Sequence, residues 1–111
     1  MSQMSRATVH ATICGFDHVI QGKRDGEVIS IDIKTPCEKI QKMSHMEFSV
    51  REVLGMDIKE NYVMTKAQEL HCSSNCLVPC GIMHVCRIEA GLLTESLCKK
   101  TGGVSITFGD D

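Results

Sequence analysis

The chain has 111 residues, 42% hydrophobic and 23% charged, which suits one domain with a modest core and excludes a disordered tail. Its formal net charge is −2, with no Trp, one Tyr and three Phe, which argues against the basic, aromatic-bearing surface of a nucleic-acid-binding domain. No apolar run approaches the roughly 18 residues of a membrane span, and the polar Met1–Arg6 shows no signal peptide. We therefore expect a single cytoplasmic domain over residues 1–111, with no membrane or nucleic-acid partner.

Three strands are predicted in the first third of the chain. Ala7–Cys14 alternates apolar and polar residues with the period of a half-buried strand, and His18–Lys23 is a second short strand. An Asp-Gly turn signal at residues 25–26 leads into Glu27–Thr35, whose three isoleucines share one face. Three consecutive strands joined in this way form an antiparallel meander, and its isoleucine face packs against the core.

From Cys37 onward the apolar residues follow helical spacing. Residues 37–55 predict one helix, or two short ones with a break at residues 44–45, ending at Gly55. Asn61–His71 has apolar residues at helical intervals and predicts another helix. Residues 79–93, which begin with a proline suited to a first helical turn, carry the apolar stripe of a third.

The last predicted element is a strand. The turn Thr101–Gly103 precedes Val104–Phe108, where apolar and polar residues alternate again. The expected fold is therefore α+β: a three-stranded antiparallel meander packed on one face by three helices. Val104–Phe108 is a candidate fourth strand at the sheet edge.

The seven cysteines are the most distinctive feature of the composition. An odd number excludes complete internal pairing, and in a reducing compartment clustered thiols are more often metal ligands or redox groups than cross-links. Cys14 ends the first predicted strand and Cys37 follows the third. Because these two strands run in the same direction, both cysteines are expected at one edge. The loop with Cys72 and Cys76, preceded by His71, reaches that edge if the helices fold back over the sheet.

Metal binding is the chemistry that these positions favour. A helix N-terminus stabilises the thiolate that binds metal; Cys37 begins a predicted helix and Cys76 precedes one. Thiolate and imidazole ligands suit zinc or an iron–sulfur cluster. We therefore expect a metal site on Cys14, Cys37 and Cys72, together with Cys76 or His71.

Several cysteines also have simpler interpretations. The three cysteines from 72 to 80 are spaced by four, which equally describes a small-residue packing seam on a helix, and buried free cysteines are common. Cys80 and Cys86 are expected to be wall or core residues. Cys98, beside two lysines, is expected to be exposed.

The order of the cysteine motifs resembles the U-type iron–sulfur cluster assembly scaffolds. It runs Ile-Cys-Gly at Cys14, a hairpin, Lys-Thr-Pro-Cys at Cys37, helices, and His-Cys-Ser at His71 and Cys72. The resemblance implies a small α+β domain that holds a cluster, or zinc, on three cysteines with a nearby aspartate and histidine. It assigns ligand roles to these four residues, and Asp17 stands one position later than the family's aspartate. It also implies a protein partner for cluster transfer.

The segments Cys-Gly-Phe, Cys-Leu-Val-Pro and Glu-Ala-Gly-Leu are similar to a family of small anaerobe and archaeal domains of unknown function.

Our first hypothesis is a binding module, rather than a catalyst, that carries or stores the metal. An enzymatic alternative is a thiol-redox or sulfur-transfer protein in which Cys37 or Cys76 attacks and another thiol resolves the disulfide. The third is an interaction domain whose cysteines only pack, and the oligomeric state, a dimer included, is left open.

Overall fold

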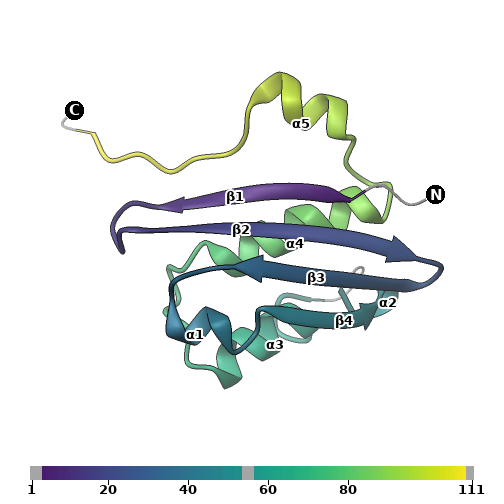
Figure 1. The fold of residues 1–111 in the computed structure, drawn as a ribbon, viewed down its shortest axis with the longest axis horizontal. Helices are drawn as coiled ribbons and strands as arrows, with labels where there is room; N and C mark the ends of the chain where they lie inside the picture. The colour runs from purple at the N-terminus through teal and green to yellow at the C-terminus, as the bar shows by residue number, and fades with distance from the viewer. Residues whose placement is uncertain (1–3, 54–56, 110–111) are drawn as a thin grey trace.

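The structure, a computed structural model, describes residues 4–53 and 57–109. A single sheet forms one layer, and α3 and α4 lie across one of its faces (Figure 1). The elements in chain order are β1 (Ser5–Ala11), β2 (Phe16–Asp25), β3 (Val28–Lys34), α1 (Glu38–Gln41), β4 (His45–Ser49), α2 (Val50–Val53), α3 (Tyr62–Glu69), α4 (Val78–Glu89) and α5 (Glu95–Thr101). The expected α+β class is confirmed.

The sheet has four antiparallel strands in the order β1-β2-β3-β4. The predicted meander supplies the first three, with Val9 opposite His18 and Ile20 opposite Ile33. Ile29, Ile31 and Ile33 all face the core, at most 6% exposed, as their alternation with polar residues predicts. The register of strand pairing is therefore set by the sheet having one apolar, packed face and one face open to solvent.

The fourth strand lies where a helix was expected, so that part of the prediction is wrong. Only α1 and α2 are helical between residues 37 and 53, and β4 runs between them; the predicted end at Gly55 lies outside the described residues. Met46 and Phe48 are buried opposite Ile31 and Ile29 of β3. The open edge of β3 provides backbone partners that a helix in this position could not use.

The predicted helices over residues 61–71 and 79–93 are present, in shorter form. Asn61 caps α3, its side-chain oxygen accepting the N–H groups of Val63 (2.9 Å) and Met64 (3.3 Å). Helix α4 packs so closely on the sheet that a Cβ on Gly81 would meet Val9 Cγ2 at 2.5 Å. That close approach places the core between the sheet and α4.

The C-terminal prediction is incomplete in one respect and wrong in another. A further helix that was not predicted, α5, precedes the expected turn; it is capped by Thr94 and ended by Gly102 in the left-handed conformation, at φ 86°. Val104–Phe108 belongs to no strand, and each of its residues is exposed. An alternating segment becomes a strand only when it reaches a partner, and here β1 remains the sheet edge. No helix among residues 4–53 and 57–109 is long and apolar enough to cross a membrane.

Candidate thiol site

Cys37 is held at the start of α1 by hydrogen bonds that reach back into the sheet. Its backbone is extended and its N–H donates to Thr35 Oγ1 (3.0 Å). The same oxygen lies 2.7 Å from His18 Nδ1. Because Thr35 Oγ1 accepts from Cys37, its own proton is free to be donated to a neutral His18. β2, the end of β3 and α1 are thereby tied together beside this thiol.

Cys72 and Cys76 lie in the connection between α3 and α4. The chain leaves α3 through His71, which has a left-handed backbone with φ 57°. The Cys72 N–H donates to the carbonyl of Ala67 (3.0 Å), and the Cys76 N–H donates to that of Ser73 (3.0 Å). These bonds fold the connection back on itself, so both thiols stay near the sheet end that Cys37 occupies.

A lysine joins the two thiol-bearing segments. Lys39 Nζ of α1 donates to the backbone carbonyl of His71 at 3.0 Å. This contact spans 32 residues of sequence and places an ammonium group beside the connection. The α1 segment and the α3–α4 connection are thus bridged by a cation at the place where thiols gather.

The Cys72 thiol lies close enough to Cys37 and Cys76 to be affected by their charges. Burial raises the pKa of the Cys72 thiol first, the negative charges of Cys76 and Cys37 raise it further, and Lys39 lowers it. Such effects need neighbouring groups, since charge interactions fall off with distance. All three cysteines are half-buried and pack against the hydrophobic core. We call these three residues the thiol cluster.

Cys14 and His71 lie at the same end of the sheet but outside this cluster. The β1–β2 turn, α1 and the α3–α4 connection all meet at that end (Figure 1). The first strand ends at Ala11, short of the predicted Cys14, because the chain turns there: the Cys14 and Gly15 N–H groups both donate to the Ala11 carbonyl. Cys14 and His71 are exposed side chains.

The thiol cluster does not have the geometry of a complete metal site. Within the described ranges 4–53 and 57–109, no group of three or more His, Cys, Asp or Glu side chains is arranged to hold a metal ion. Asp17, considered as a further ligand near Cys14, instead lies 3.0 Å from His10. A metal bound here would require the thiol side chains to turn toward a common point.

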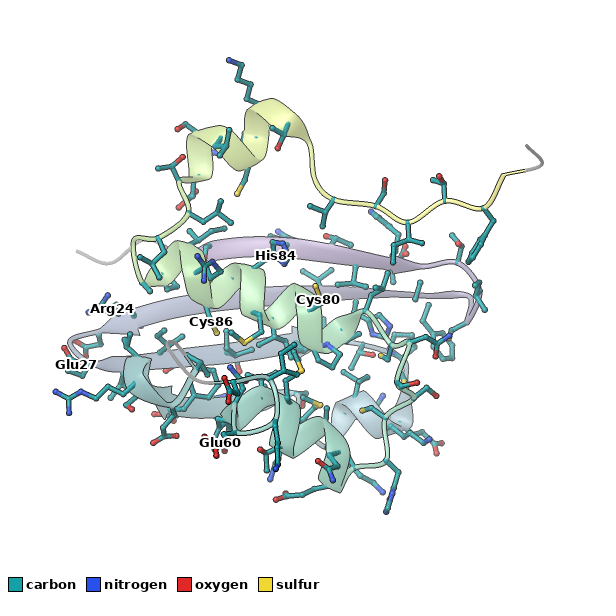
Figure 2. All side chains as sticks on the ribbon, turned by 180° about the vertical axis from the view of Figure 1, so that it is seen from behind. Arg24, Glu27, Glu60, Cys80, His84 and Cys86 are labelled. Atoms are coloured by element: carbon teal, nitrogen blue, oxygen red, sulfur yellow. The ribbon has the colours of Figure 1, made fainter. Side chains whose placement is uncertain are left out.

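The remaining cysteines separate into buried and exposed. Cys86 is fully buried, and its burial, together with the charge of Glu89, raises the pKa of its thiol to about 12; it is the expected core residue. The expectation that Cys80 is a wall or core residue is wrong, because it is exposed. Its Sγ lies 3.8 Å from His84 Nδ1, one turn along α4 (Figure 2). Cys98 is partly exposed.

His18 and Thr35 are the site residues that sequence reasoning missed. His18 is only 2% exposed, and burial lowers its pKa against the opposing charge of Asp17. One signal was available: His18 shares strand parity with the buried Ile20, and Thr35 with Ile33. A polar residue on the packed face of a strand must find a partner inside the fold.

Comparison with known proteins adds a family and no activity. Residues 5–101 match a family described as "Family of unknown function (DUF6951)". No curated protein matches the chain, and no solved structure does.

Proposed function

The chain belongs to the DUF6951 family, and we propose that it is a small module that binds a thiophilic metal through Cys37, Cys72 and Cys76. Zinc or an iron–sulfur cluster suits such ligands. The observation that supports this best is that Cys37, Cys72 and Cys76 are all half-buried against the same core, with Lys39 joining their two segments. Burial, and then the neighbouring Cys76 and Cys37, raise the pKa of Cys72. A cation bound beside it would favour the thiolate, because it replaces repulsion with attraction.

The surroundings of the cluster suit an anionic metal complex. Three thiolates around a divalent cation carry a net charge of −1, and the Lys39 ammonium already offsets part of the rise in the pKa of Cys72. A complete site needs a fourth ligand. His71 and Cys14, the exposed residues at the same end of the sheet, are our candidates for it.

Partial burial favours carriage or storage of the metal over catalysis. The three thiols are neither sealed in the core nor fully open, so a bound metal would be held yet within reach of another protein's ligands. A partner protein that receives the metal or cluster is part of the proposal. The proposal also includes a cytoplasmic location, because free thiols such as these seven stay reduced there.

Anaerobic loading tests the proposal directly. The full chain is loaded under reducing conditions with cobalt(II) as a probe for zinc, and separately with iron and sulfide. Thiolate-to-metal absorption and metal content are then measured. We expect one metal centre per chain, lost in Cys72→Ser and Cys37→Ser. The matched control Cys98→Ser, in α5, should bind as the wild type does. Absence of bound metal in the wild type would refute the proposal.

The rival thiol-redox function makes a different prediction. It requires a cysteine that is ionised at neutral pH, with Cys37 or Cys76 as the attacking thiol. Under that function one thiol would react rapidly with iodoacetamide at neutral pH with no metal added. Slow, similar alkylation of Cys37, Cys72 and Cys76, with protection after metal loading, supports the metal module instead.

A further inference from the structure

The C-terminal arm, residues 91–109, contributes nothing to the core. None of its residues is buried, α5 included. Its large apolar side chains are open to solvent: Leu97 is 50% exposed, Ile106 68% and Phe108 81%. A seven-residue helix is unstable in water without packing, and contiguous exposed apolar groups mark interaction surfaces. The arm therefore has the composition of a segment that is covered in its working state.

The sheet offers an unfilled place for such a segment. β1 is an outer strand, and in the described part of the chain no strand pairs with its outer edge, which leaves backbone N–H and C=O groups open. On the helix-covered side of β1, Ala7 and Ala11 are small and only partly buried. Larger side chains from an added strand would find room beside them.

The last residues of the arm have the pattern that this edge requires. Val104, Ile106 and Phe108 fall on one face of an extended segment, and two hydroxyl residues fall on the other. The sheet likewise has one packed face and one polar face. An added strand over Val104–Phe108 would place its apolar face toward the packed side.

Strand direction indicates which copy of the chain supplies the added strand. Figure 1 shows that residues 104–108 run in the same direction as β1, and they do not form a strand paired to it. Pairing within one chain would thus be parallel in a sheet that is otherwise antiparallel. In a second copy related by a two-fold axis perpendicular to the strands, β1 runs the opposite way. Its pairing with the arm is then antiparallel, the slightly more stable arrangement, and it is reciprocal.

We propose that the arm is a dimerisation element: residues 104–108 of each copy add as an antiparallel strand to the β1 edge of the other. Backbone hydrogen bonds hold the two chains together, and the three apolar side chains of the segment leave water. This inference does not depend on the thiol cluster, which lies elsewhere in the fold. Its failure would leave the metal-binding proposal untouched, and the reverse also holds.

Sedimentation velocity of the full chain, with a reductant to exclude intermolecular disulfides, tests the proposal. We expect a dimer in the wild type and a monomer in Ile106→Pro, because proline removes a backbone donor from the added strand. The arm is unburied in the single chain, so this variant should keep the circular dichroism of the wild type. The matched control Thr107→Val, on the polar face of the same segment, should remain dimeric.

Three results would overturn the inference. The first is a wild-type chain that stays monomeric up to several hundred micromolar. The second is a dimer that Ile106→Pro leaves intact. The third comes from amide hydrogen exchange, which reports where the arm docks: the β1 amides should be more protected in the wild-type dimer than in Ile106→Pro. Equal protection would place the contact somewhere other than the β1 edge.

Discussion

Ser5 Oγ donates a 2.6 Å hydrogen bond to the carboxylate of Glu89, joining the first residue of β1 to the last residue of α4 across 84 positions of sequence. Ser5 is 1% exposed. Arg24 supports the same corner by donating to the Glu89 backbone carbonyl (3.3 Å). The helix is thus fastened to the sheet at the end opposite the thiol cluster, and the β1 edge is held in place.

Ser5→Ala should destabilise the protein. The substitution leaves a partly buried carboxylate without its donor, which costs about 1–3 kcal/mol. Urea unfolding measures the loss as a lower midpoint with an unchanged slope. Ser105→Ala, in the exposed arm, is the matched control and should leave the midpoint of the folded domain where it was. Equal midpoints for Ser5→Ala and the wild type would contradict the role assigned to this bond.

Thr35→Val should loosen the start of α1. Valine keeps the shape of threonine but removes the oxygen that meets both Cys37 N–H and His18 Nδ1. Two polar groups then lose their partner, at a cost of about 1–3 kcal/mol each if they stay buried. Urea unfolding and exchange of the Cys37 amide measure the effect. Thr8→Val, on the exposed face of β1, is the control, and similar amide exchange in the two variants would count against the prediction.

His18 should make the protein less stable in acid. Burial lowers its pKa below 6.5 in the folded state, so the unfolded chain binds a proton more readily. Its contribution to the free energy of unfolding is therefore complete at pH values above 6.5 and declines as the pH falls through that value. NMR titration of the ring gives the folded pKa directly. A folded value above 6.5 would show that the sign is wrong.

His45 should have the opposite effect. The hydrogen bonds that its ring donates to Asp32, at 2.7 Å, and then to Glu47, at 3.2 Å, raise its pKa above 6.5. The protonated ring therefore stabilises the β3–β4 pair below pH 6.5, and that contribution is lost as the pH rises through the folded pKa. The ring is solvent-exposed, so salt should weaken the effect. Urea unfolding of His45→Gln across this range should lack that pH dependence; an unaltered profile would refute the assignment.

Gly81→Ala should separate α4 from β1. The new methyl group would lie 2.5 Å from Val9 Cγ2 and 3.0 Å from Ile20 Cδ1, closer than carbon atoms can pack. Although alanine favours helices, we expect a net loss of about 1–3 kcal/mol from overpacking. The neighbouring Cys80→Ala, on the exposed side of the helix, is the control in thermal unfolding. A variant as stable as Cys80→Ala would mean that the two layers can move apart freely.

Part of the fold could be predicted because local patterns and the tertiary environment agree. The isoleucines of β3 alternate with exposed residues, and the Asp-Gly turn before them suits only a tight connection. β4 could not be predicted in the same way. The apolar residues from Phe48 to Val53 fit helical spacing, and the pairing of Met46 and Phe48 with β3 outweighs it.

The sequence alone predicted that Cys37, Cys72 and Cys76 lie at the ends of helices and strands, because local periodicity and turn residues determine strand direction and helix boundaries. Whether their thiols are close enough to affect one another depended on how α3 and its connection fold back, which no local pattern encodes. The same holds for His18 and Thr35, whose hydrogen bond joins positions 17 residues apart. It also holds for the last residues of the arm, which have the pattern of a strand but no partner strand in the described part of their own chain. A strand and a hydrogen-bonded pair both need two parts of the polypeptide to meet, and long-range packing alone decides which parts do.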